Sequence, residues 1–490
     1  MQTKNSPISV FFLFALTLLL SGCVPQVETL EPQLNVPETF ANLPEGESAK
    51  SEDTLANTIW SKYFGDQHLI DLIDAALQQN QELRIFSQQI LIAQNEILAR
   101  QGAYLPSVEL GADAGLDKVG EYTRKGAVES NLEIAPDKSF PDPLPDFFLG
   151  AQASWEIDIW SKLRNAEKSA FMEYLASAEG RKFLLTNLIA EVANSYFELL
   201  ALDSQLDLVQ QNIAIQSRAL QIVRLKKQGA RVTELALRRF EAQLFKTRSL
   251  QYGIQQNIVE VENRINFLLG RYPQAIPRNA QRIEDLHPAK IGAGFPTELL
   301  ENRPDVKRAE LELAAANLNV EVARARFYPS LRLTGSYGYS AYDTAKLFES
   351  PQSMLYALGG SLTAPFINRR DIEAMYRNAS AKQIQSVIDY EQAVLKAFIE
   401  VTNQISNIDN LEKNYLLKSQ QVKALNESVE ISTTLFNAAR ADYMEVLLTQ
   451  REALDARFEL IETKMSQFRA SIALYRALGG GWQQAKDGTS

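Results

Sequence analysis

The chain carries the same short motif at two places. Residues 103–110 read AYLPSVEL, and residues 326–333 read RFYPSLRL. Each copy follows a helical pattern, opens an alternating strand pattern and leads into a very long stretch without proline, over 161–272 and 366–478. The second stretch also lacks glycine. Repetition on this scale constrains the whole architecture, because each copy predicts one unit of a strand and a long helix.

Alternation of apolar and polar residues follows the repeated motif, as expected for β-strands. In the first copy Val108 and Leu110 point to one side, and Glu109 and Asp113 point to the other. A partner strand follows each copy, although the pattern of the last one is blurred. We predict four strands, at residues 107–118, 147–158, 330–341 and 354–364.

Two folds fit strands with one polar and one apolar face. A soluble sandwich would bury the apolar face, whereas a membrane barrel would turn it to lipid and line its lumen with the polar face. Four strands cannot close a barrel, since about eight are needed, and an open edge inside lipid leaves backbone groups without partners. A membrane-inserted chain must therefore oligomerise. Two copies would give eight strands, and three would give twelve with room for a water-filled lumen.

The proline-free stretches carry apolar seams with steps of three and four residues, typical of helices packed side by side. The first seam consists of Ile189, Val192, Tyr196, Leu199, Leu206, Val209, Ile213, Leu220 and Val223, and the second runs from Val394 to Val429. A helix over residues 161–228 would be roughly 100 Å long, which is enough to reach across a periplasm. We predict four long helices, at residues 161–228, 233–269, 367–437 and 442–478.

These elements divide the chain into two repeats. A polar segment with four prolines precedes the first repeat and has the composition of an extended tether, and a segment rich in Pro and Gly separates the repeats. The predicted parts are a signal peptide (1–22), the tether (23–58), repeat 1 (59–270), a linker (271–296), repeat 2 (297–482) and a C-terminal tail (483–490).

The single cysteine, Cys23, lies three residues after the end of a short apolar run from Ile8 to Leu20. That run is too short to span a bilayer as a stable helix. Its end, Leu-Ser-Gly-Cys, resembles the bacterial lipoprotein box, so we predict that cleavage before Cys23 leaves an acylated N-terminal cysteine. The alternative is an ordinary secretory signal with an incidental cysteine.

Composition argues against several function classes. The net charge of −10 argues against nucleic-acid binding, which needs clustered Lys and Arg. The only two histidines, His68 and His287, lie in unrelated contexts, which argues against a histidine metal site or a catalytic triad. We therefore expect no catalytic residues, no metal and no cofactor apart from the covalent lipid on Cys23.

Three segments together carry a resemblance to a known family. They are residues 301–306 (ENRPDV), 327–330 (FYPS) and 154–160 (SWEIDIW). The chain resembles the TolC-type outer-membrane efflux proteins, in particular the acylated subset called outer-membrane efflux lipoproteins. The resemblance covers Trp60 to Trp482.

The resemblance implies an α+β membrane protein. It would be a homotrimer whose twelve-stranded barrel, four strands per chain, lies in the outer membrane of a Gram-negative bacterium. The barrel would continue into a periplasmic tunnel of long coiled-coil helices. The protein would be the passive exit duct of a tripartite efflux system for small molecules, with a periplasmic adaptor and an inner-membrane transporter as partners. The alternatives are a structural or adaptor lipoprotein without a pore and, with no catalytic constellation to support it, an enzyme.

The resemblance also places a gate at the narrow periplasmic end, where return helices of the family begin with an Asp-Val-Leu-Asp-like motif. This chain has Glu445 at the first acidic position and Leu448 at the second, while repeat 1 has Ala236 in place of the first acid. We expect a gate that mixes a carboxylate with an apolar constriction, formed by Glu445, Leu448, Glu234, Arg231, Arg440 and Asp442. The alternative, a solvated helix end with ordinary charges, stays open.

The tip turns and three prolines give two further expectations, an adaptor contact and a junction between barrel and tunnel. Small residues at the two tip turns would let the helices of an adaptor approach closely; these contacts are Gly229, Ala230, Arg231, Ala438, Ala439 and Arg440. Three prolines should mark the change from barrel to tunnel, because proline ends regular structure. They are Pro106, Pro329 and Pro365.

Overall fold

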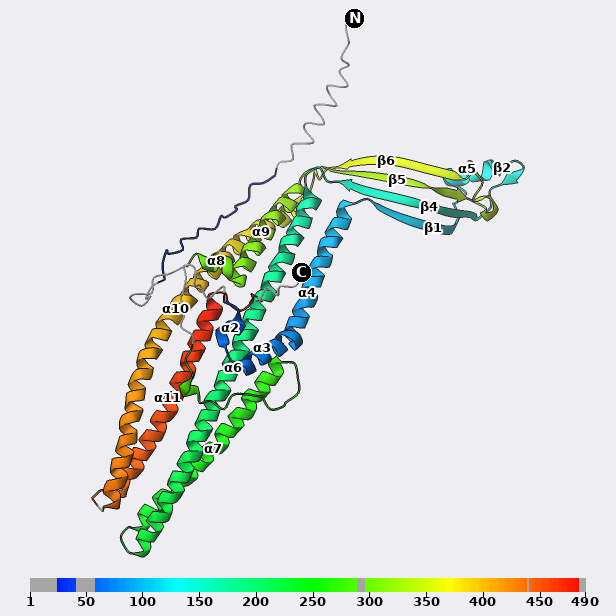
Figure 1. Cartoon of the computed structure of the whole chain (residues 1–490). Coiled ribbons are helices and arrows are strands. Elements are labelled where there is room, and N and C mark those ends of the chain that lie inside the picture. The colour runs from blue at the N-terminus through cyan, green and yellow to red at the C-terminus, as the bar shows by residue number, and fades with distance from the viewer. Residues whose placement is uncertain (1–23, 41–57, 289–295, 439, 484–490) are drawn as a thin grey trace. The chain divides into compact units, whose positions relative to one another are not determined.

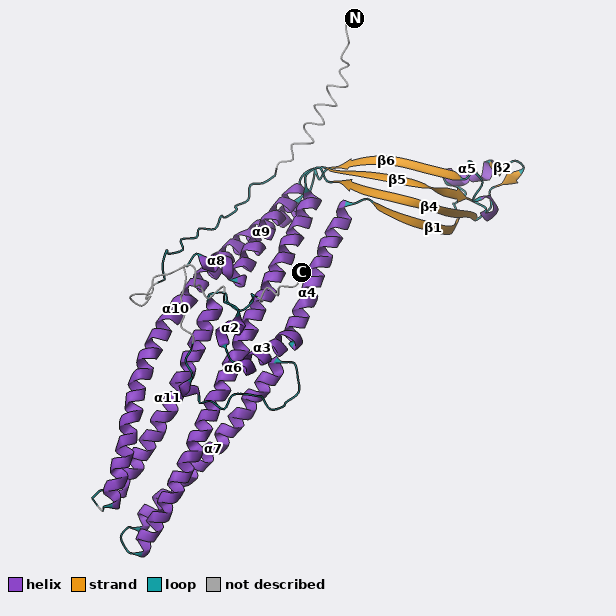
Figure 2. Cartoon of the chain, in the orientation of Figure 1, coloured by secondary structure: helices purple, strands orange, loops and turns teal. Residues whose placement is uncertain are grey.

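The computed structural model describes residues 24–40, 58–288, 296–438 and 440–483 (Figure 1). The predicted lipidation site Cys23 and the predicted tip residue Ala439 lie outside the described residues. Helices make up most of the described chain, and one antiparallel sheet holds the long strands (Figure 2). None of the described helices combines the length and the apolar content needed to cross a membrane.

Four helices dominate the chain and occur as two matched pairs. In repeat 1, α6 (Lys162–Gln228) has 67 residues and α7 (Glu234–Leu268) has 35. In repeat 2, α10 (Arg370–Asn437) has 68 residues and α11 (Tyr443–Ala477) has 35. Left-handed glycines end both return helices, with φ of 66° at Gly270 and 88° at Gly479; this conformation suits glycine, which has no Cβ.

The remaining helices are short or medium in length. The segment before the first strand, which has helical periodicity throughout, divides into three helices. The first break lies at Gly65, which adopts a left-handed conformation, and Asp66 caps the next helix. The second break lies at Asn80, whose backbone is not helical and whose side chain accepts from Leu83 N–H. These helices are α2 (Trp60–Phe64), α3 (Gln67–Gln79), α4 (Gln81–Tyr104), α5 (Arg124–Asn131), α8 (Glu298–Asn302) and α9 (Pro304–Ala325), with 3₁₀ turns η3 (Ile283–Asp285) and η4 (Thr344–Lys346).

The main sheet has the order β1-β4-β5-β6, and all its pairs are antiparallel. The strands are β1 (Ser107–Asp117), β4 (Leu144–Ile157), β5 (Ser330–Ala341) and β6 (Met354–Thr363). Strand β4 starts three residues before the expected 147, and the other strand boundaries lie within a residue of the expected ones. Among the described residues, β1 and β6 are edge strands with one unpaired side each. A small hairpin, β2 (Glu133–Ala135) with β3 (Lys138–Ser139), and helix α5 lie between β1 and β4; the sequence patterns did not predict them.

Neither face of this sheet is buried in the described chain. Apolar side chains of one face are largely exposed, including Val108 (66 %), Leu110 (86 %), Tyr356 (77 %) and Leu358 (89 %). A soluble sandwich would cover such a face with a second layer. The sheet therefore has the surface of a membrane-barrel sector.

Register resolves the blurred pattern of the last strand. Ser361 pairs with Arg332, which in turn pairs with Glu156, so the three side chains share one face. Alternate residues of β6, including Tyr356 and Leu358, therefore belong to the apolar face. The polar face contains Glu109, Asp113, Asp117, Asp146, Gln152, Ser154, Glu156, Arg332, Thr334, Ser336 and Ser361.

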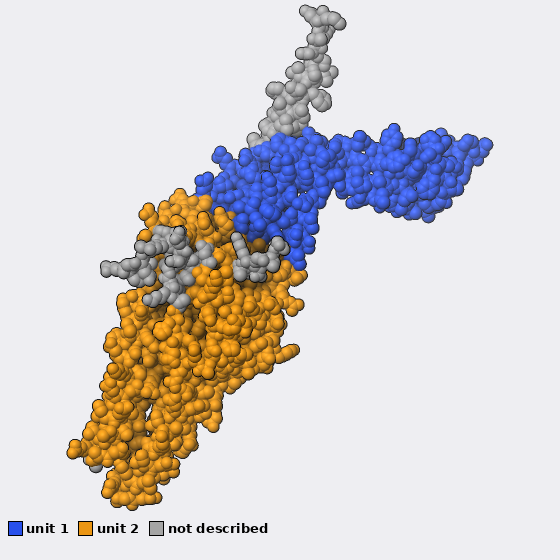
Figure 3. Space-filling model, in the orientation of Figure 1, with its two compact units in different colours: residues 1–31, 91–175, 311–387 blue, residues 32–90, 176–310, 388–490 orange. Residues whose placement is uncertain are grey.

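Contacts divide the chain into two compact units that both draw on both repeats (Figure 3). Unit 1 contains the strands and comprises residues 1–31, 91–175 and 311–387. Unit 2 contains the long hairpins and comprises residues 32–90, 176–310 and 388–490. The division follows neither repeat boundary, because strands of the two repeats pair with each other and helices of the two repeats pack together.

The core of unit 2 lies along the first apolar seam. Val192, Tyr196, Leu199 and Val209 of α6 are all fully buried. The second seam is buried at Ala397 and Val401 but only half-buried from Ile408 to Val429. Between Ile408 and Val429, α10 thus has apolar side chains that the described part of its own chain only partly covers.

The linker between the repeats is packed against the helices. Ile283 is fully buried and its N–H donates to Ser204 of α6 at 3.2 Å. Arg278 of the same linker pairs with Asp203 (2.5 Å) and Glu262 (2.6 Å). These contacts fasten the linker to the side of unit 2.

Candidate functional site

Both helical hairpins of unit 2 end in short turns at the same end of the unit (Figure 1). An apolar cluster connects the two tips. It consists of Leu220, Val223, Leu237, Phe240 and Leu244 from repeat 1, against which Phe436, Tyr443 and Leu447 from repeat 2 pack. The predicted gate and adaptor residues of the two repeats therefore lie on neighbouring hairpins.

The repeat 1 turn closes α6 with two backbone hydrogen bonds. Arg231 N–H donates to Lys226 O, and Ala230 N–H donates to Lys227 O, both at 2.9 Å. This is a Schellman ending, whose left-handed residue is usually glycine. Here that residue is Ala230, with φ of 56°. The equivalent outer bond in repeat 2 joins Arg440 N–H to Leu435 O at 2.9 Å.

An ionic network joins α6 to α7 just above the repeat 1 turn. Glu234 pairs with Lys227 of α6 and with Arg238 (2.8 Å). Arg238 also pairs with Glu241 (3.0 Å), and Glu241 pairs with Arg224 of α6 (2.9 Å). The predicted gate residue Glu234 is therefore occupied by bonds within its own hairpin.

The cations of this network lower the pKa values of both carboxyl groups. The hydrogen bond from Lys227 is the main reason that the pKa of Glu234 lies below its usual value. The hydrogen bond from Arg224 does the same for the pKa of Glu241. Both groups are therefore held as carboxylates by charge-assisted bonds.

Repeat 2 has uncharged residues at the matching positions. Aligning the turns places Phe436 at the position of Lys227, Tyr443 at that of Glu234 and Leu447 at that of Arg238. These three residues pack on the apolar cluster of repeat 1. The ammonium group of Lys226 lies 3.9 Å from the ring centroid of Phe436 and 3.3 Å from its carbonyl oxygen. At these three described positions the repeat 2 tip therefore makes apolar and cation–π contacts where the repeat 1 tip makes ion pairs.

The remaining predicted gate residues point away from this cluster. Glu445 is exposed, and Leu448 three residues later is 45 % exposed, so they share an uncovered face of α11. Ala236, the repeat 1 counterpart of Glu445, is fully buried. Asp442 is the exposed N-cap residue of α11, without a side-chain capping bond.

Arg231 and Arg440 are also exposed, and in the described part of the chain neither forms an ion pair. The repeat 1 tip thus has a closed ionic network beside the exposed Arg231, whereas the predicted gate residues of repeat 2 are all exposed. The described residues of the predicted adaptor surface are Gly229, Ala230, Arg231, Ala438 and Arg440.

Sequence reasoning missed the network partners and the inter-repeat contacts. These residues are Arg224, Lys226, Lys227, Arg238, Glu241 and Phe436. A position-by-position comparison of the two repeats contains the signal, because charged residues in one copy stand against apolar residues in the other.

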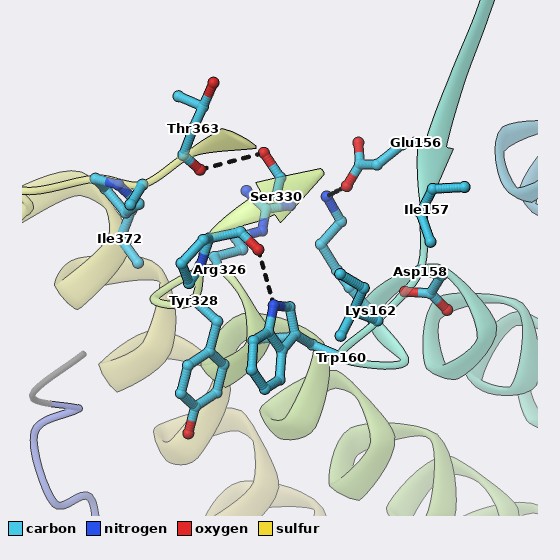
Figure 4. A pocket seen from close by; sticks show the side chains of 15 residues that line it. Glu156, Ile157, Asp158, Trp160, Lys162, Arg326, Tyr328, Ser330, Thr363 and Ile372 are labelled. Carbon is cyan, nitrogen blue, oxygen red and sulfur yellow. Dashed lines mark hydrogen bonds and ion pairs between the residues drawn. The ribbon is translucent and has the colours of Figure 1, made fainter. Parts of the chain in front are cut away.

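A second candidate site lies in unit 1, where the strands meet the helices (Figure 4). A hollow of about 520 Å³ is lined by the ends of α9, β4 and β6 and by the starts of β5, α6 and α10. Two of the predicted junction residues, Pro329 and Pro365, line it, and Pro106 does not.

Trp160 holds this junction together. Its indole N–H donates to Pro329 O at 2.8 Å, and its ring stacks on Tyr328 with centroids 4.7 Å apart. Lys162 pairs with Glu156, as Figure 4 shows. Asp158 accepts hydrogen bonds from the N–H groups of Leu163 (3.1 Å) and Arg164 (3.0 Å) and so caps the start of α6. The arrangement is structural: it fixes the turn from strand to helix.

Among the described residues, no group of three or more His, Cys, Asp and Glu side chains is placed to hold a metal ion.

Comparison with known proteins identifies the fold and the family. The family model for outer membrane efflux proteins matches residues 72–271 and 295–480. The pyoverdine export outer membrane protein OpmQ of Pseudomonas putida is 30 % identical over 436 residues, which cover 89 % of this chain and 91 % of the relative. The probable outer membrane lipoprotein SilC of Salmonella typhimurium is 25 % identical over 465 residues, with coverage of 95 % and 97 %.

Solved structures give the same answer. The open-state MtrE outer membrane channel of Neisseria gonorrhoeae superimposes with a TM-score of 0.80 at 26 % identity, covering 94 % of this chain and 98 % of that one. The expected fold class is confirmed: the chain is an α+β protein of the trimeric outer-membrane channel type, with four barrel strands and two long helical hairpins per chain. The chain belongs to the outer membrane efflux protein family, whose members act in the outer membrane as exit ducts of efflux systems and extend into the periplasm.

Proposed function

We propose that three copies of this chain form one duct by pairing β1 of each copy with β6 of the next. The observation that carries this proposal is the open four-stranded sheet with both faces exposed. Such a sheet is stable in lipid only when its edges are paired. Three sectors supply twelve strands, enough to enclose a water-filled lumen lined by the polar face.

The helices support the same assembly. Large apolar side chains remain exposed along them, and such surface can mark an interaction site. On α4 and α7 they are Ile85, Ile92, Leu98, Phe245, Tyr252 and Phe267, and on α10 they are Ile388, Leu395, Leu416 and Leu417. Three chains with two hairpins each would bury these faces in a tunnel with approximate sixfold symmetry.

The gate lies at the repeat 2 tips. Glu445 and Leu448 form an uncovered face of α11, and in a trimer three such faces converge on the lumen. The ionic network stiffens the tip of the repeat 1 hairpin, while the tip of the repeat 2 hairpin rests on apolar contacts. The repeat 2 hairpins therefore move when the duct opens, and Arg440 and Asp442 face the opening.

The partners are a periplasmic adaptor at the tip turns and an inner-membrane pump behind it. The turn residues Gly229, Ala230 and Ala438 are small, so helices of an adaptor can pack closely on them. The cargo consists of small molecules delivered by the pump. Cys23 carries the acyl chains, as its position after the apolar leader indicates. SilC, a relative of this chain, is described as a probable outer membrane lipoprotein.

Cross-linking between copies tests the proposed edge pairing. Each variant carries one cysteine at an apolar position of β1, such as Leu110, and one at an apolar position of β6, such as Leu358, and different variants sample different registers. The proposal predicts a ladder up to a covalent trimer for pairs in one register, and none for cysteine pairs within β4. Absence of any β1–β6 cross-link in folded, membrane-inserted protein contradicts the assembly.

A further inference from the structure

The segment that follows Cys23 is docked on the helices. Residues 24–40 form neither helix nor strand, and their composition predicts a free tether. Val24 and Val27 nevertheless pack against an apolar cluster of unit 1 formed by Val320, Ala323, Phe327 and Tyr376. Phe327 lies two residues before Pro329, immediately ahead of strand β5.

Helix α10 binds the backbone of this segment. Leu30 N–H donates to Oε1 of Gln383 at 3.1 Å, and Nε2 of Gln383 donates back to Leu30 O at 2.7 Å. The hydroxyl group of Ser380 donates to Glu28 O at 2.5 Å. Gln383 and Ser380 are 2 % and 6 % exposed. These buried groups find their partners in the segment, so its departure would break three hydrogen bonds.

Binding through the backbone fixes the direction and register of the segment. Tyr376, Ser380 and Gln383 form one stripe on α10, with spacings of four and three residues. Val24 lies at the Tyr376 end and Leu30 at the Gln383 end. In unit 2 the same segment continues with Gln33 N–H bound to Glu391 at 2.7 Å and with Phe40 stacked on Phe398 at 5.5 Å.

We propose that residues 24–31 are a strap that fixes the acylated N-terminus beside the start of strand β5. The lipid is then attached at a fixed position on the protein and not at the end of a flexible tether. A flexible tether of residues 24–40 would let the anchor wander by about 23 Å. The docked strap leaves one peptide unit, about 3.8 Å, between Cys23 and the first bound residue. The acyl chains of each copy then enter the membrane at one defined point of the barrel rim. The proposal rests on the proposed acylation of Cys23.

Glu-specific proteolysis tests the strap in the full-length, acylated protein. Glu28 and Glu31 are the cleavage points, and the Glu28 carbonyl is one of the bound groups. The test variant is Ser380→Ala with Gln383→Ala, and the control is Ser386→Ala, whose hydroxyl group bonds only within α10. Loss of three hydrogen bonds, each worth about fivefold, predicts cleavage about a hundredfold faster in the test variant and unchanged in the control. Equal and rapid cleavage of wild type and test variant overturns the strap.

A spin label gives a second measurement that does not depend on cleavage. In acylated protein Gln26→Cys is the only reactive thiol, because Cys23 is the sole native cysteine and its sulfur carries lipid. The strap predicts an immobilised spectrum in wild type and control and a mobile one in the test variant. A mobile spectrum in wild type overturns it. The mass of the N-terminal peptide reports acylation separately: an unmodified Cys23 refutes the proposed lipid while leaving the docking of residues 24–31 intact.

Discussion

The guanidinium group of Arg303 donates to the carboxylate of Glu400 over 2.9 Å, which joins the start of α9 to the middle of α10. Arg303 also pairs with Asp305 (2.6 Å) and donates to the carbonyl of Ala477 at 3.0 Å, near the end of α11. Its side chain is only 5 % exposed. One buried cation thus connects three helices of unit 2.

Arg303→Ala should destabilise the protein strongly, because it leaves two carboxylates without their buried partner. Breaking a buried pair in this way costs about 3–5 kcal/mol. The matched control is Arg469→Ala, whose side chain is 56 % exposed and whose partner Glu198 keeps Arg264. Removing such an exposed pair costs about 0–1 kcal/mol. Thermal unfolding in detergent separates the two; similar melting temperatures for both variants would show that Arg303 is dispensable.

Acidification should loosen the repeat 1 tip before the repeat 2 tip. The pKa values of Glu234 and Glu241 are lowered in the folded hairpin, so their contribution is present above the ordinary glutamate pKa of about 4.5. It is lost as pH falls below that value through the lowered pKa. The rate of amide hydrogen exchange of residues 224–241, divided by its intrinsic rate, should therefore rise as the pH falls from about 5 to about 3. Residues 433–450 serve as the internal reference, and a parallel rise there would refute the asymmetry.

Opening the proposed gate should raise conductance. Glu445→Ala combined with Leu448→Ala removes a charge and a bulky side chain from each copy, so the constriction widens. Single-channel recording in planar bilayers should show higher conductance than wild type. Glu462→Ala, an exposed change elsewhere on α11, is the control. Conductance equal to that of the control would remove Glu445 and Leu448 from the gate.

The adaptor surface predicts a loss of transport without a loss of assembly. Bulky residues at Ala230 or at Ala439 should block adaptor contact, and Ala438→Trp tests the same turn at a described, exposed position. Efflux in cells should fall to the level of a strain lacking the duct, while trimers form normally. Ala230→Gly keeps the surface small and relieves a left-handed alanine, so efflux should persist. Efflux retained by Ala438→Trp would argue against the contact.

The lumen of the barrel should prefer cations. Its polar face carries Glu109, Asp113 and Asp146, and in the described part of the chain none of these carboxylates forms an ion pair with Lys or Arg at 4.0 Å or less. Changing all three to their amides should reduce the cation-to-anion permeability ratio measured from reversal potentials in a salt gradient. The control is Glu121→Gln, outside the strands. An unchanged ratio would place the selectivity filter elsewhere.

Local patterns predict the regular elements well. Helix α10 begins at Arg370, three residues after the expected position, because Asn368 adopts a left-handed conformation (φ 57°) that delays it. Strand alternation locates β1 and β5 because a period of two needs only neighbouring residues. The glycines at positions 270 and 479 end the return helices for an equally local reason.

Long-range contacts are the part that the sequence does not reveal. The sequence of residues 24–31 predicts a free tether because nothing local reveals the hydrogen bond of Leu30 with Gln383, which is 353 residues away in the chain. Arg303 looks like part of an ordinary helix start, since its partners Glu400 and Ala477 come from other helices. At the tip, Glu234 looks free to line a gate until its bond to Arg238 is known.

Three copies of the chain should make one conducting duct. Native mass spectrometry of the acylated protein, followed by planar-bilayer recording of the same preparation, tests this directly. The expected result is a trimer that conducts ions in discrete steps. A monomer or a dimer would contradict the proposed duct, and so would a trimer that does not conduct ions.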